Sequence, residues 1–165
     1  MLEGKKQKGF TLVELLVAIA VIGLVATLSM VSLQSARIQA RNTRRLTDLR
    51  QIRSALELYQ NDHQGYPVST GGAGVWDGLY SSWGDSSTNW IDGLSPTYIA
   101  QLPRDPRNDT DPTRQYLYRS DGTDYKLISH QPEDCVGFVT TYPEIADPTR
   151  DCWAFGFYTP GAQNW

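Results

Sequence analysis

The chain has 165 residues, of which 40% are hydrophobic and 20% charged, with a formal net charge of −3. This length provides one modest domain, and the composition is that of an ordinary globular chain. Two histidines and two cysteines without metal-ligand spacing give no zinc motif, and the sequence has no phosphate-binding glycine loop or EF-hand spacing. No nucleophile stands beside a candidate base, so we expect no enzymatic activity.

The N-terminal segment joins a basic stub to a long apolar run. Lys5, Lys6 and Lys8 come first, and residues 15–33 carry no charge. About 19 residues at 1.5 Å each give roughly 28 Å, close to the apolar thickness of a bilayer. The run is also longer than the apolar core of a secretory signal peptide. We therefore predict a membrane-spanning helix with the lysines in the cytoplasm and the remaining chain across the membrane.

Glu14 lies four residues inside the apolar segment that starts at Phe10, where an ionised side chain is costly and needs a cationic partner. The sequence here resembles the class III signal of type IV prepilins and type II secretion pseudopilins. The match consists of Gly9, Phe10, Thr11, Leu12 and Glu14. The resemblance implies that a prepilin peptidase cuts after Gly9, that Phe10 becomes the methylated N-terminus, and that Glu14 contacts the amino terminus of a neighbouring subunit. The alternative is a plain membrane anchor, which would not require this motif.

Residues 34–64 are predicted to continue the helix, because apolar residues recur at helical spacing and no proline occurs from residue 10 to residue 61. The apolar stripe consists of Ile38, Leu46, Leu49, Ile52, Leu56 and Tyr59. Six arginines occupy mostly the other positions and make this half of the helix basic. Gly65 is expected to take the left-handed position that ends the helix, and Pro67 prevents its continuation.

Charge is divided unevenly along the chain. Residues 34–61 carry six arginines against two acidic residues, whereas residues 62–165 carry six basic and fourteen acidic residues. These are either two solvated surfaces or complementary surfaces of neighbouring copies, where the basic helix of one faces the acidic head of another. The acidic head argues against general nucleic-acid binding.

Residues 69–95 form a long segment rich in glycine and serine, without clear periodicity, which predicts a loop. Its aromatic side chains are Trp76, Tyr80, Trp83 and Trp90. They either fold back onto the sheet and fix the loop, or form an exposed surface that recognises a glycan or a partner.

Residues 116–119 and 124–129 predict a β-hairpin, because an Asp-Gly pair at 121–122 separates two short runs rich in tyrosine and aliphatic residues. This region again resembles major pseudopilins, whose strands form a small antiparallel sheet on the helix. Residues 136–141 and 153–158 are candidates for further strands.

Asp121 and Asp124 are the candidate calcium ligands, since calcium prefers carboxylate and carbonyl oxygens. Major pseudopilins often bind calcium in the loop after such a hairpin, but residues 130–135 replace the Gly-Ala-Asp-Gly-like stretch that carries that site. The alternative is that both are ordinary turn residues, so calcium is the one cofactor to consider.

Cys135 and Cys152 are the only cysteines, and an even number outside the cytoplasm favours a disulfide over two buried thiols. Such a bridge resembles the C-terminal disulfide loop of many type IV pilins.

Together these patterns predict an α+β fold of the type IV pilin kind, a long N-terminal transmembrane helix packed on a small antiparallel sheet. The expected parts are a leader (1–9), a transmembrane helix half (10–33), an amphipathic helix half (34–64) and a globular head (65–165). We expect a subunit that is cleaved, N-methylated and polymerised into a type IV pilus or a type II secretion pseudopilus. The alternative is a membrane-anchored extracytoplasmic module whose tryptophan-rich loop binds a glycan.

The resemblance also implies partners and a location. The partners are further copies of the chain, the prepilin peptidase, an inner-membrane assembly platform with its ATPase, and minor pilins or pseudopilins. The precursor is expected in the cytoplasmic membrane as a single-pass protein, and the mature subunit in a periplasmic or extracellular filament.

Overall fold

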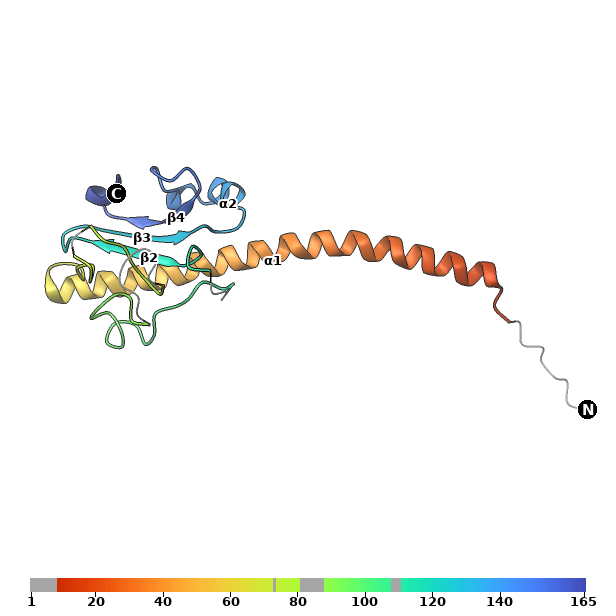
Figure 1. Cartoon of the computed structure of the whole chain (residues 1–165), viewed down its shortest axis with the longest axis horizontal. Helices are drawn as coiled ribbons and strands as arrows, with labels where there is room; N and C mark the ends of the chain where they lie inside the picture. Colours follow the sequence, from red (N-terminus) through yellow and green to blue (C-terminus); the bar gives the residue numbers. More distant parts are fainter. Residues whose placement is uncertain (1–8, 73, 81–87, 108–110) are drawn as a thin grey trace, which may run out of the picture. The chain divides into compact units, whose positions relative to one another are not determined.

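The computed structural model describes residues 9–72, 74–80, 88–107 and 111–165, without the side chains of residues 28–32. The chain divides into two compact units, one up to Arg37 and one from Ile38 onward. The helix α1, Leu12–His63, contributes to both units with 52 residues (Figure 1). The predicted helix is therefore continuous, as the absence of proline indicated.

From here on, the head means the second unit, which contains part of α1 as well as residues 65–165. It is built on a four-stranded antiparallel sheet in the order β1-β2-β3-β4 (Figure 1). The strands are β1 (Asp77–Gly78), β2 (Tyr116–Ser120), β3 (Tyr125–His130) and β4 (Ala154–Tyr158). The β2–β3 pair is the predicted hairpin, with Tyr116 opposite Ser129 and Ser120 opposite Tyr125. Gly122 in its turn has φ = 94°, the left-handed conformation expected of the Asp-Gly pair. The predicted α+β class and the hairpin are confirmed.

The main core lies between the apolar stripe of α1 and one face of the sheet. Leu49, Ile52 and Leu56 are fully buried there. They belong to one apolar cluster with Tyr118 and Leu127, which alternate with outward residues along the strands. The segment around residues 90–102 packs into the same cluster, and Figure 1 draws it (green) on the side of α1 away from the sheet.

The opposite face of the sheet carries a smaller cluster of Leu117, Ile128 and Ala154, and the ring of Trp76 packs on it. Trp90 is buried in the main core and only 3% exposed. Two of the four loop aromatics thus fold back onto the protein, as the first of the two interpretations held. Trp83 lies outside the described residues.

The prediction of a strand at residues 136–141 is wrong, because α2 (Cys135–Thr141) is a helix there. Valine and threonine favour strands, but the preference is weak and tertiary contacts override it. Phe138 of α2 packs on Phe155 of β4 with ring centroids 5.3 Å apart. Two short 3₁₀ helices, η1 (Pro143–Ile145) and η2 (Pro160–Ala162), follow α2 and β4. The other candidate strand is confirmed as β4.

The end of α1 also differs from the prediction. Gln64, with φ = 58°, takes the left-handed position that was assigned to Gly65. Gly65 is required for a different reason, since a Cβ there would lie 2.9 Å from the carbonyl oxygen of Gly122. The backbone N–H of Tyr66 donates to the same oxygen at 2.8 Å, so the hairpin turn lies against the end of α1.

Candidate functional site

Thr11 and Glu14 form a capping box at the start of α1. The Glu14 backbone N–H donates to Thr11 Oγ1 at 3.3 Å, and Glu14 Oε2 accepts from the Thr11 N–H at 2.9 Å and from its hydroxyl at 2.8 Å. These bonds satisfy groups that have no partner inside the helix. Glu14 Oε1 accepts no hydrogen bond from the described residues. The Thr-x-x-Glu spacing was a readable signal for this cap, which the sequence analysis missed.

Gly9 and Phe10 precede the helix and are both exposed, Phe10 by 85%. A Cβ built on Gly9 meets nothing within 4 Å. The peptide bond between these two residues is therefore accessible, although cleavage there stays a prediction.

The first unit exposes a nearly continuous apolar surface along α1. Its exposed side chains include Leu12, Val13, Leu15, Leu16, Val17, Ile19, Val21, Ile22, Leu24 and Val25. A surface of this extent marks contact with other protein or with lipid.

Across the part of the chain that is described, no helix meets the combined length and hydropathy needed to cross a bilayer.

In the head, Cys135 and Cys152 form the expected disulfide, with their Cα atoms 5.4 Å apart. It joins the first residue of α2 to the segment just before β4.

Glu133, two residues before Cys135, is held against α1 by Arg41 and Arg45. We call these three residues the arginine clamp. Arg41 donates to both oxygens of Glu133 at 2.6 Å, and Arg45 donates to Glu133 Oε2 at 3.3 Å. Arg45, fully buried, also donates to Asp105 at 2.7 and 2.9 Å. The hydrogen bonds from Arg41 hold the pKa of Glu133 below its usual value.

Of the six arginines of this helix, Arg41 and Arg45 are paired in the arginine clamp, and the other four are exposed. Arg45 precedes Leu49, Ile52 and Leu56 at spacings of four, three and four, so it falls in the buried register of the helix. That register was readable from the sequence, but the carboxylates that partner Arg45 were not.

A second buried charge escaped the sequence analysis. Lys126 is 0% exposed, and its ammonium donates to Asp147 at 2.9 Å and to the carbonyl oxygens of Gln163 and Trp165 at 3.0 Å. Burial lowers the pKa of Lys126, and the hydrogen bond that its ammonium donates to Asp147 opposes this shift. Arg150 donates to the other oxygen of Asp147 at 2.7 Å. These contacts fix the C-terminal segment on the outer face of the sheet.

The two calcium candidates are engaged in turn geometry. Asp121 Oδ1 accepts the backbone N–H groups of Thr123 and Asp124 at 2.9 Å, and Asp124 Oδ1 accepts that of Gly161 at 3.2 Å. Among the described residues, no group of three or more His, Cys, Asp or Glu side chains is arranged to hold a metal ion. Calcium binding at Asp121 and Asp124 stays a prediction.

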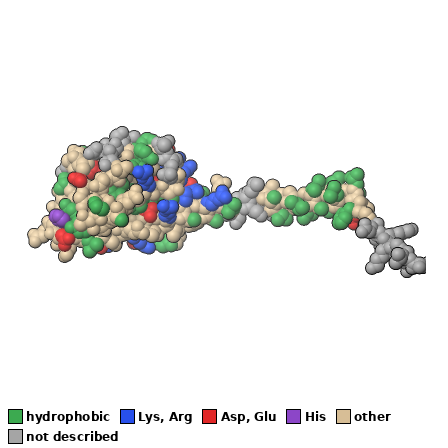
Figure 2. Space-filling model, turned by 90° about the horizontal axis from the view of Figure 1, so that it is seen from below, with side chains coloured by type: hydrophobic (Ala, Val, Ile, Leu, Met, Phe, Trp, Pro, Cys, Tyr) green, Lys and Arg blue, Asp and Glu red, His purple; other side chains and the backbone are tan. Residues whose placement is uncertain are grey.

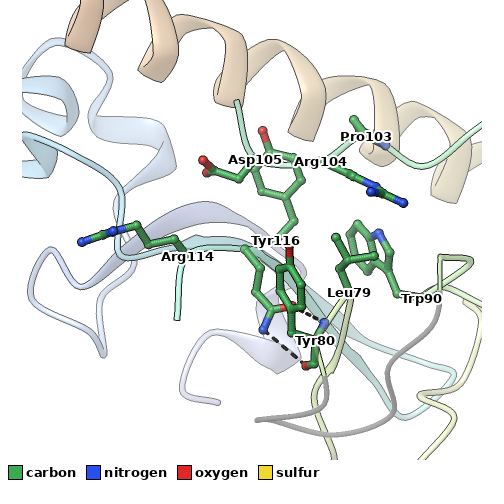
Figure 3. Close-up of a pocket in the computed structure, with 9 residues that line it drawn as sticks. Leu79, Tyr80, Trp90, Pro103, Arg104, Asp105, Arg114 and Tyr116 are labelled. Atoms are coloured by element: carbon green, nitrogen blue, oxygen red, sulfur yellow. Dashed lines mark hydrogen bonds between the residues drawn. The ribbon is translucent and has the colours of Figure 1, made fainter. Parts of the chain in front are cut away.

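A small cavity lies between the 103–105 segment and β2 (Figure 3). Gln115 closes one side by accepting the backbone N–H of Tyr80 at 2.9 Å and donating to its carbonyl oxygen at 3.4 Å. Trp90 and Leu79 line the other side. The cavity measures about 10 Å³, room for one water molecule, so it admits no substrate.

Comparison with known proteins agrees with this arrangement. Residues 4–30 match the family model of the prokaryotic N-terminal methylation motif. The type II secretion system core protein G of Pseudomonas aeruginosa is 30% identical over 125 residues, which cover 74% of this chain and 80% of the relative. The proteins of the same name from Pectobacterium carotovorum and Klebsiella pneumoniae are 29% identical, covering 90% and 89% of this chain and 83% and 92% of each relative. No solved structure matches the chain.

A methylation motif at the start of a long helix, followed by a helix-backed antiparallel sheet, defines the pseudopilin class of structural subunits. Within that class, the chain belongs to the type II secretion system core protein G family. Two filament types were considered above, the type IV pilus and the type II secretion pseudopilus. This family is named for the second.

Proposed function

We propose that the chain is cleaved after Gly9, methylated on the Phe10 amine and polymerised into a type II secretion pseudopilus. The observation that carries this proposal is the methylation motif at residues 4–30 in a chain whose relatives are core proteins of type II secretion systems. The exposed bond between Gly9 and Phe10 supports access by a prepilin peptidase. Those relatives are named for a secretion apparatus, which supports a structural role without catalysis.

Cleavage creates the cation that Glu14 needs. The new Phe10 ammonium lies one residue before the capping box. The helix dipole is positive at this end, so it stabilises the carboxylate of Glu14. Glu14 Oε1, which accepts no hydrogen bond from the described residues, can accept from the ammonium of a neighbouring copy. Such a pair is maintained in apolar surroundings, because losing one partner of a buried pair costs about 3–5 kcal/mol.

The proposed setting follows from the same motif. The precursor is a single-pass protein of the inner membrane with its head across the membrane, and the mature chain passes into the filament. Its partners are further copies of itself, minor pseudopilins, the prepilin peptidase and the assembly platform with its ATPase.

Intact-mass measurement of the chain purified from cells with a secretion system tests the processing step. A chain that begins at Phe10 with one added methyl group is expected. An unprocessed chain that still supports secretion would overturn the proposal.

Assembly is tested by Glu14→Gln, which keeps the size of the side chain and removes its charge. Loss of filaments with membrane insertion preserved is expected, while the exposed Glu144→Gln should assemble normally. The alternative of a glycan-binding module predicts that both variants remain functional. It finds little support in Trp76 and Trp90, because both are packed against the protein.

A further inference from the structure

One end of the head presents arginines in an open groove, which we call the arginine groove. Its volume is about 410 Å³, and its lining residues are Arg44, Gln101, Leu102, Pro103, Arg104, Asp105 and Pro106. Asp105 is turned away to Arg45, which binds both of its oxygens. Arg44 is 67% exposed and reaches a carboxylate only at 3.9 Å, in Asp48. Arg104 is exposed and forms no salt bridge with the described residues. The groove therefore offers two cationic groups to another molecule.

The other end of the head carries the opposite charge. We call it the acidic end, and it consists of Asp62, Asp92, Asp121 and Asp124. Asp62 lies in the last turn of α1, and the Asp121 turn lies against Gly65. Gly93, beside Asp92, packs so closely on Tyr59 that a Cβ built on it would lie 3.3 Å from the ring. None of the four forms a salt bridge with a described residue. Figure 2 shows the basic side chains (blue) mainly toward one end of the head; acidic ones (red) lie beside a histidine (purple) at the other end, and others are scattered over the head.

These two surfaces cannot neutralise each other within one copy. Arg44 and Asp62 are both on α1, and the helix between them is about 27 Å long at 1.5 Å per residue. At that distance opposite charges in water are screened at physiological salt. A charged partner for either surface therefore belongs to a second molecule.

We propose that the arginine groove of one copy binds the acidic end of the next copy, head to tail. This inference rests on the proposed function and specifies the surfaces that meet. A head-to-tail contact between two different surfaces does not close on itself, so repetition gives an open helical fibre. Complementary charge fixes the orientation and register of such a contact, and like charges disfavour the reversed arrangement.

Charge reversal in the full-length chain tests the contact, in cells that have the secretion system but lack their own copy of this protein. One variant reverses the groove (Arg44→Glu with Arg104→Glu), and the other reverses the acidic end (Asp62→Lys with Asp92→Lys). Each alone is expected to reduce the amount of filament by about tenfold or more, because like charges then meet. Co-expression of the two variants, or all four changes in one chain, should restore filaments to within about twofold of the original.

Arg50→Glu with Arg53→Glu is the matched control, because both arginines lie on α1, are 55% and 48% exposed, and do not line the groove. This control should assemble nearly normally. Formation of the Cys135–Cys152 disulfide in every variant shows that the head still folds.

The possible results separate this inference from the function on which it rests. If the single reversals assemble normally, or if the combined reversal is no better than either alone, the head-to-tail contact is wrong although the chain is still a pseudopilin. Loss of assembly only in the groove reversal, without rescue, would mean that a different partner occupies the groove. If the unaltered chain forms no filaments and restores no secretion, the proposed function itself fails.

Discussion

Replacing Arg45 by methionine is expected to destabilise the head by about 3–5 kcal/mol, the cost of removing one partner from a buried ion pair. Arg45 is fully buried and donates to Asp105 at 2.7 and 2.9 Å and to Glu133 at 3.3 Å. Methionine would fill most of the space of the side-chain stem. It would leave the carboxylate of Asp105, which is 6% exposed, without its guanidinium.

The same substitution at Arg50 is the control, because Arg50 lies on the same helix and pairs with Glu144 at 3.7 Å, with both side chains 55% exposed. An exposed pair of this kind contributes about 0–1 kcal/mol. The comparison therefore isolates the effect of burial.

Urea unfolding of the purified full-length chain in detergent, with the disulfide intact, measures both changes. At a slope of about 1–3 kcal/mol per molar urea, the midpoint of Arg45→Met should fall by 1 M or more with an unchanged slope. Equal midpoints for the two variants would refute the conclusion that the arginine clamp stabilises the head.

Three further predictions concern stability. Arg41 holds the pKa of Glu133 below its usual 4.5, so ionised Glu133 stabilises the folded head. This stabilisation is full above about pH 4.5 and is lost as the pH falls through the lowered pKa. Arg41→Met should therefore flatten the acid limb of a stability–pH curve. Serine at both Cys135 and Cys152, 17 residues apart, should cost about 3 kcal/mol in urea unfolding, and a change below 1 kcal/mol would contradict this. Thr11→Val should cost about 1 kcal/mol and speed amide exchange in the first turn of α1, whereas Thr11→Ser should not.

The sequence predicted the elements whose signals are local. The apolar stripe of α1 correctly identified Leu49, Ile52 and Leu56 as core residues, because helical spacing alone determines which side chains share a face. The β2–β3 hairpin followed from its turn, since Gly122 supplies a positive φ that other residues adopt with difficulty.

Interactions between distant segments were not predictable in the same way. Arg45 finds its partners 60 and 88 residues away in the sequence, and no pattern within α1 names them. The helix α2 was missed for the same reason, because the packing of Phe138 on Phe155 outweighs the strand preference of its valines and threonines. At the N-terminus the motif indicated Glu14, whereas its contact with Thr11 was missed although the Thr-x-x-Glu spacing is a local signal for a capping box.

The disulfide between Cys135 and Cys152 encloses α2, η1 and the segment that leads to β4. A peptide bond hydrolysed anywhere inside that loop would leave a single covalent molecule, with both new ends still attached through sulfur. The C-terminal piece would contain Cys152 and β4, which is paired with β3 along five residue positions. A subunit nicked there would therefore keep its sheet intact, and the break would become visible only after reduction.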